Sequence, residues 1–156
     1  MIVDTSVLPV GRNVDYESQA ELERLAALKG EAQRFLEGLR WTPPIADLIL
    51  AFGVAPIVAL FLVRFERGIE GEGNGDTEIW VVVGDLPSAY FVVEACPRPA
   101  EALAVYCELM ENWANNVIAG GDLSGSYPVS IEPTVEHAEM LKGRVRFISE
   151  KMIPLA

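Results

Sequence analysis

Carboxylates are the chemically active side chains that this sequence supplies in quantity. Five of them follow one another through the middle of the chain: Asp85, Glu94, Glu101, Glu108 and Glu111. The last three recur at helical intervals, whereas the first two are expected in a turn and at the end of a strand. Two such groups in a cleft could act as general acid and base, or could bind a hard cation. Spacing alone does not show convergence, and a solvated acidic face is the commoner arrangement.

The sequence offers few other groups for catalysis. Its single histidine, His137, is expected in the first turns of a helix, on the face away from the apolar stripe. The two cysteines, Cys96 and Cys107, show no metal-binding or disulfide spacing. The glycine-rich run 71–75 lacks the lysine of a phosphate-binding loop, and 121–125 lacks the spacing of a nucleophile elbow. We therefore predict no catalytic residue, no metal ion and no cofactor.

The negative charge of the chain is concentrated in one segment. Residues 66–122 hold eleven acidic residues and two basic ones, a formal charge of −9, whereas the whole chain carries −11. A localised negative field attracts basic partners and repels nucleic acid and anionic lipid. The sequence therefore predicts a basic protein partner, and no binding of nucleic acid or of a membrane surface.

Aromatic residues are interleaved with these acids. Trp80 lies in a predicted strand in which aromatic and aliphatic residues alternate, and Tyr90 lies in the next strand. Both faces of the strand of Trp80 are expected to be covered. If part of the aromatic face is open, an aromatic centre with an acidic rim is typical of a protein-binding hot spot. The candidate binding face therefore consists of Trp80, Asp85, Tyr90, Glu94, Glu101, Glu108 and Glu111.

Length and composition indicate one globular α+β domain over residues 1–156, with an irregular arm at 1–14. About half of the 156 residues are apolar and about a fifth are charged, which suffices for a packed core. The start of the chain lacks the basic and apolar pattern of a secretory signal, so a cytoplasmic setting is expected. The apolar run 45–63 approaches the length of a membrane span. Asp47, Gly53 and Pro56 interrupt it, so a buried helix followed by a buried strand is predicted instead.

Periodicity divides the chain into helices and strands. The predicted helices cover 16–40, 42 to about 53, 97–119 and 134–153, with Thr42 capping the start of the second. The predicted strands cover 57–66, 78–83 and 89–94, joined by short links, and 129–131 is a candidate edge strand. The expected fold is an antiparallel meander sheet of three to four strands packed against helices, in the order α-α-β-β-β-α-α.

Four short patterns in the sequence resemble a known group of proteins. The string Ile79-Trp-Val-Val-Val-Gly-Asp-Leu-Pro-Ser-Ala-Tyr90 is followed by Pro99-x-x-Ala102-x-x-x-Tyr106, by Trp113-Ala114 and by Leu141-x-x-Arg144-x-x-Phe147. This pattern resembles small bacterial proteins of unknown function, some of which look like immunity proteins of toxin systems. The resemblance covers roughly the second half of the chain and implies a binding role rather than a reaction.

Three functional hypotheses remain open at this point. The first is an acidic interaction protein that docks a basic toxin or nuclease domain. The second is a small carboxylate-dependent or metal-dependent hydrolase built on Asp85, Glu94, Glu101 and Glu108. The third is a structural homo-oligomer, with the apolar run 45–63 as the dimer interface.

Overall fold

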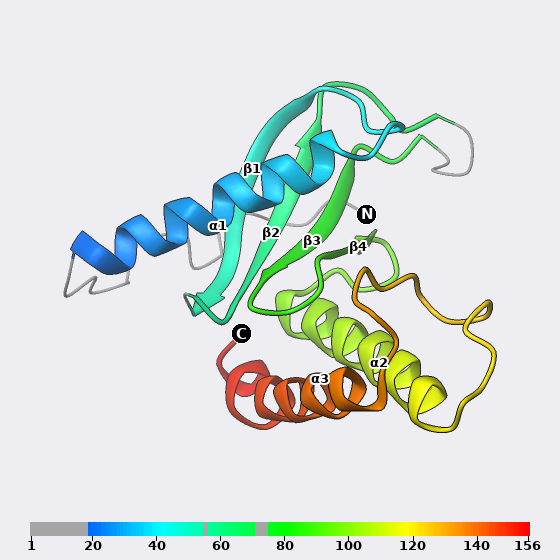
Figure 1. The fold of residues 1–156 in the computed structure, drawn as a ribbon. Helices are drawn as coiled ribbons and strands as arrows, with labels where there is room; N and C mark the ends of the chain where they lie inside the picture. Colours follow the sequence, from blue (N-terminus) through cyan, green and yellow to red (C-terminus); the bar gives the residue numbers. More distant parts are fainter. Residues whose placement is uncertain (1–18, 55, 71–74) are drawn as a thin grey trace. The chain divides into compact units, whose positions relative to one another are not determined.

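The computed structural model describes residues 19–54, 56–70 and 75–156, and within them it contains one antiparallel sheet and three α-helices (Figure 1). The chain forms two compact units, Met1–Pro99 and Ala100–Ala156. The predicted irregular arm at 1–14 lies outside the described residues. The α+β class and the antiparallel meander are confirmed.

The first unit consists of one helix and four strands. Its elements are α1 (Gln19–Glu37), β1 (Ile45–Val54), β2 (Val58–Phe65), β3 (Glu78–Gly84) and β4 (Ala89–Val92). The strands are ordered β1-β2-β3-β4 in the sheet, each antiparallel to its neighbours. The predicted strands at 57–66, 78–83 and 89–94 correspond to β2, β3 and β4.

The predicted second helix is wrong, because the residues assigned to it form β1. Short apolar runs fit a buried helix and a buried strand equally well by periodicity alone. Pairing along the whole length of β2, from Ile45 opposite Phe65 to Val54 opposite Val58, decides in favour of the strand. The apolar run 45–63 is therefore a β-hairpin.

None of the helices in the described parts of the chain is long and apolar enough to span a membrane.

The second correction concerns the fourth strand of the sheet. The sequence suggested residues 129–131 as a brief edge strand, but these residues have no regular secondary structure. The fourth strand is β1, which pairs with β2 at the opposite end of the sheet from β4. Because β1 replaces the predicted second helix, the described residues contain three α-helices instead of the four that were predicted.

One face of the sheet packs against α1, which runs obliquely across β1, β2 and β3 (Figure 1). The helix contributes Leu28, Ala32 and Leu36 to this core, the last two without exposed surface. The sheet contributes alternate residues of its two central strands, as strand geometry requires: Ala59, Phe61, Val63, Phe65, Ile79, Val81 and Val83. Burial of these side chains is the main stabilisation of the unit.

An ion pair marks the pairing of β2 with β3. Arg64 and Glu78 lie opposite each other in the register, and Arg64 Nε donates to Glu78 Oε2 at 2.9 Å. The Glu78 side chain is 7% exposed and that of Arg64 is 32% exposed. Within the described residues, Glu78 Oε1 has no hydrogen-bond partner. The carboxylate therefore depends on Arg64 for much of the stabilisation of its charge.

The second unit is helical. It contains α2 (Pro99–Ile118) and α3 (Val135–Phe147), and α3 continues into a π-helical turn at Ile148–Met152 and a 3-10 turn at Ile153–Leu155. The apolar stripe predicted on α2 is confirmed, because every one of its members is buried: Leu103, Tyr106, Cys107, Met110, Trp113, Ala114 and Val117. The Cys107 thiol donates to the Val145 carbonyl oxygen at 3.7 Å and so links the two helices.

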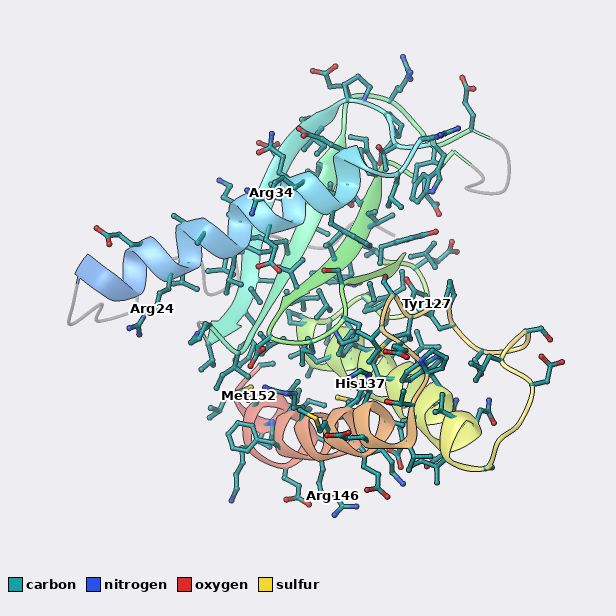
Figure 2. All side chains as sticks on the ribbon, in the orientation of Figure 1. Arg24, Arg34, Tyr127, His137, Arg146 and Met152 are labelled. Atoms are coloured by element: carbon teal, nitrogen blue, oxygen red, sulfur yellow. The ribbon has the colours of Figure 1, made fainter. Side chains whose placement is uncertain are left out.

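Two side chains in this unit have clear structural roles. The Thr134 hydroxyl caps α3 by accepting the backbone N–H of His137. His137 Nδ1 donates to the Glu132 carbonyl oxygen at 3.0 Å, so the imidazole closes the loop that precedes the helix (Figure 2). Burial, with a smaller contribution from the negative charge of Glu111, raises the pKa of the Cys107 thiol to about 11.

Replacing Glu78 tests the ion pair. Glu78→Leu should lower the free energy of unfolding by about 2 kcal/mol, because it removes the carboxylate that Arg64 contacts. The double variant Arg64→Met with Glu78→Leu should recover most of this loss, since apolar pairs of similar volume often replace buried ion pairs without cost. Urea denaturation of the two variants measures both values. A double variant that is less stable than Glu78→Leu would contradict this account.

Cys107 should make stability depend on pH in the alkaline range. A thiol whose pKa is higher in the folded state stabilises that state fully below the unfolded pKa, near 9, and loses this effect as pH rises to about 11. The urea midpoint should therefore fall between pH 9 and pH 11 more steeply for the natural chain than for Cys107→Ser. Parallel curves for the two proteins would show that the thiol does not titrate as described.

Candidate functional site

The clearest candidate site is a cavity of about 400 Å³ in the first unit, at the β4 edge of the sheet. Residues from four parts of the chain line it: Trp41, Ile69, Glu70, Asp76, Ile79, Tyr90, Phe91 and Val92. We call this cavity the edge pocket. It combines aromatic rings, aliphatic side chains and two carboxylates, and none of its described lining residues is basic.

The end of α1 places Trp41 in the edge pocket. The Thr42 hydroxyl lies 3.0 Å from the Leu36 carbonyl oxygen and 3.1 Å from that of Leu39, and it donates to both. Leu36 lies in the last turn of α1 and Leu39 lies just after the helix, and the Leu36 carbonyl oxygen also accepts the Leu39 N–H at 3.0 Å. Thr42 therefore closes the end of α1 and does not cap a following helix. The two prolines that follow direct the chain into β1 in an extended conformation.

Strand register places Tyr90 on the same side. Tyr90 in β4 pairs with Val81 in β3, so both side chains lie on the sheet face that packs against α1. The Tyr90 ring lies 4.9 Å from that of Trp41, at an interplanar angle of 55°. It also lies 6.3 Å from the ring of Phe35, which belongs to α1. The Trp41 and Tyr90 rings therefore form a corner rather than a flat stack.

The link between β2 and β3 supplies the acidic side. The Ile69 N–H donates to the Asp76 carbonyl oxygen at 2.8 Å, and the Gly75 N–H donates to the Ile69 carbonyl oxygen at 2.9 Å. Gly75 has a φ of 75°, in the left-handed region that glycine adopts without strain. These bonds hold Glu70 and Asp76 beside each other in the pocket lining. Glu70 is exposed and Asp76 is half-buried.

This arrangement suits a cationic guest. The faces of tryptophan and tyrosine rings carry negative charge density that attracts cations, and carboxylates accept hydrogen bonds from cationic donors. Val92, the exposed aliphatic member, can pack against the apolar part of a guest. The edge pocket therefore has the chemistry to bind an apolar stem that ends in a positive charge.

The residues that were predicted for binding are divided between the two units. Trp80, Asp85, Tyr90 and Glu94 belong to the first unit, and Glu101, Glu108 and Glu111 belong to the second. Of these seven, Tyr90 alone lines the edge pocket. Asp85, Glu94, Glu108 and Glu111 are exposed, and Glu101 is half-buried.

Trp80 has no surface to offer a partner. Its side chain is fully buried, and its indole N–H donates to the Cys96 carbonyl oxygen at 2.7 Å. Trp80 therefore lies on a covered face, and it cannot form the exposed centre of the candidate binding face. Alternation along a strand shows which residues share a face, but it does not show whether that face is covered.

Seven of the eight described lining residues of the edge pocket were not predicted from the sequence, among them Trp41 and both carboxylates. Glu70 and Asp76 are two of the eleven acids in the segment 66–122, and nothing in the sequence sets them apart from the others. Trp41 directly follows a predicted helix, and this position alone does not indicate a binding residue. No local sequence pattern indicates that these residues share a site, because Glu70 and Asp76 lie in the link between β2 and β3 whereas Trp41 follows α1. The two acids do lie on either side of the glycine-rich run 71–75 in the sequence, which is the one feature that links them.

The second unit contains a smaller polar cavity of about 290 Å³. Its lining is uncharged: Leu109, Asn112, Asn115, Asn116, Gly125, Ser126 and Tyr127, the last in the loop before α3 (Figure 2). Asn116 Nδ2 donates to the Ser126 hydroxyl at 2.6 Å, so part of its hydrogen-bonding capacity is used internally. The cavity lacks the paired nucleophile and base that covalent catalysis requires.

The metal-dependent hypothesis finds no cluster among the described residues. No group of three or more His, Cys, Asp or Glu side chains there is placed to hold a metal ion. Asp85 lines a shallow groove of about 380 Å³ in the first unit, together with Arg24 and Glu31. That groove does not include Glu94, the other acid of the hydrolase hypothesis in the first unit.

Comparison with known proteins adds no further assignment. No protein-family model, curated protein or solved structure matches this chain. The resemblance to immunity proteins therefore stays a prediction, and function has to be argued from the residues themselves.

The Thr42 hydroxyl should matter for the stability of the first unit. Thr42→Val keeps the shape of the side chain but removes the donor to two carbonyls, so it should lower the free energy of unfolding by about 1 kcal/mol. Thr77→Val is the matched control, because Thr77 is exposed and should tolerate the change within about 0.5 kcal/mol. Urea denaturation measures both. Equal stabilities would mean that Thr42 does not secure the end of α1.

Proposed function

We propose that this protein is a non-catalytic binding module whose acidic surface docks a basic protein. The partner would be a toxin or nuclease domain with a cationic active surface, which the acidic protein would cover as an immunity-type inhibitor does. The basis of the proposal is the negative charge of segment 66–122, much of which lies at the surface of the folded chain.

The observation that carries the proposal is the exposure of the acidic segment. Most of its carboxylates lie at the surface: Glu66, Glu70, Asp85, Glu94, Glu108, Glu111 and Asp122 are exposed. The first four belong to the first unit and the last three to the second. Exposed charges of one sign create a field that steers oppositely charged proteins and accelerates their association.

Two further observations support a binding role. The edge pocket presents aromatic and acidic groups together, which is the composition of a binding hot spot. The carboxylates that the hydrolase hypothesis required are divided between the two units, two in each. No observation specifically favours self-association: of the two strands in the proposed interface 45–63, β2 is already buried and β1 is only partly exposed.

Neutralising exposed carboxylates tests this function. A variant with Glu66→Gln, Glu94→Gln, Glu108→Gln and Glu111→Gln should capture less basic protein from a lysate of the source organism at low salt. The association rate of the natural chain with a purified captured partner should fall at least tenfold between about 50 mM and 500 mM salt. Mass spectrometry identifies the captured proteins and stopped-flow measures the rates.

The control variant carries Lys142→Gln and Arg146→Gln, which remove positive charge from α3 and should leave capture intact or stronger. Figure 2 shows Arg146 projecting from α3 on the side away from α2. Recovery of only neutral or acidic proteins at low salt, or equal capture by the acid-neutralised variant, would refute the proposed function.

A further inference from the structure

We propose that the edge pocket receives one arginine side chain of the basic partner. This inference rests on the proposed function, because the partner supplies the arginine. The proposed function explains only a general attraction between the exposed acids and a basic protein. This inference adds which side chain of the partner is bound and where it is bound.

The dimensions of the edge pocket favour a single long side chain. Its volume of about 400 Å³ lies near the lower end of the range for pockets that hold small molecules. Val92, which is exposed, can cover the methylene groups of such a guest, and the buried Ile69 and Ile79 lie beneath this part of the lining. The charged end would then reach the carboxylates and the aromatic rings.

The aromatic corner favours a guanidinium over an ammonium group. Guanidinium is planar and weakly hydrated, so it stacks on an aromatic face with little loss of solvation. The Trp41 and Tyr90 rings contact each other, with centroids 4.9 Å apart and planes at 55°, and Trp41 is 38% exposed, so a planar cation can stack on the open part of the Trp41 ring. An ammonium group is compact and strongly hydrated and gains less from this geometry.

The two carboxylates complete the recognition. Guanidinium offers five N–H donors in a fixed plane, and Glu70 and Asp76 together offer four acceptor oxygens. Because Asp76 is half-buried, its bond to a cation would be less screened by water than a bond at an open surface. No described lining residue is basic, so the described lining offers no positive charge to compete with the partner for these acids.

Peptides with one variable residue test the guest. The probe is a capped glycine-serine nonapeptide whose central residue is arginine, lysine or the neutral isostere citrulline, titrated into the full chain and followed by NMR. The arginine peptide should bind about threefold more tightly than the lysine peptide and at least tenfold more tightly than the citrulline peptide. Equal binding of the arginine and citrulline peptides would overturn the proposal.

Pocket variants test the location. Glu70→Gln with Asp76→Asn should weaken binding of the arginine peptide at least fivefold, whereas the matched variant Glu139→Gln with Glu150→Gln, which neutralises two exposed acids outside the segment 66–122, should not change it. Trp41→Leu should weaken binding about threefold, and Trp41→Phe should recover part of the loss. Thermal melts confirm folding, and the acid variant serves if Trp41→Leu is unfolded. Unchanged arginine binding in the acid variant would overturn the proposal.

Failure of this proposal and failure of the proposed function look different. If the pocket variants leave arginine binding unchanged while salt-dependent capture of a basic protein persists, the pocket assignment fails and the function stands. If no basic protein is captured but the arginine peptide binds through the pocket residues, the function fails and the arginine-binding pocket stands.

Discussion

The packing of α1 on the sheet is the constraint on which the candidate site depends. Ala32 and Leu36 are fully buried against the central strands, so the helix cannot shift along the sheet without losing core contacts. Leu36 also provides one of the carbonyls that accept from Thr42, so the point where the helix ends is coupled to the core. Trp41 directly precedes Thr42 and therefore takes its position from the same contacts. A residue on the surface is thus held by the interior of the unit.

The register of the sheet is the second determinant of the site. A shift of one residue between β3 and β4 would move Tyr90 to the opposite face, away from Phe35 and Trp41. Register is strongly specified where strands are buried, and the central strands β2 and β3 are buried along almost their whole length. The ion pair between Arg64 and Glu78 adds a polar contact at one register position of β2 and β3, which are otherwise apolar. Register is least strongly specified at β4, the four-residue edge strand that contains Tyr90.

The parts of the fold that were predictable are those whose residues carry a local pattern. The 3.6-residue spacing of Leu103, Tyr106, Met110 and Trp113 indicated α2, and the β-branched run at 78–83 indicated β3. The hairpin strand β1 was not predictable in this way, because long-range pairing with β2 decides its conformation. The edge pocket was still less predictable. Trp41, Asp76 and Tyr90 are far apart in sequence, and no periodicity links the end of a helix to an inter-strand connection and an edge strand.

The exposed acids and the edge pocket would contribute to binding in different ways. Glu66, Glu94 and Glu108 are exposed, so their attraction for a partner acts over about one Debye length and is weakened by salt. Such charges mainly set how fast a complex forms. Contacts in a partly enclosed pocket are less screened and mainly set how slowly a complex dissociates. A protein with the acids alone would bind many basic partners weakly. The aromatic corner of Trp41 and Tyr90 is the feature that would let this chain distinguish one basic surface from another, because stacking requires a particular side chain at a particular place.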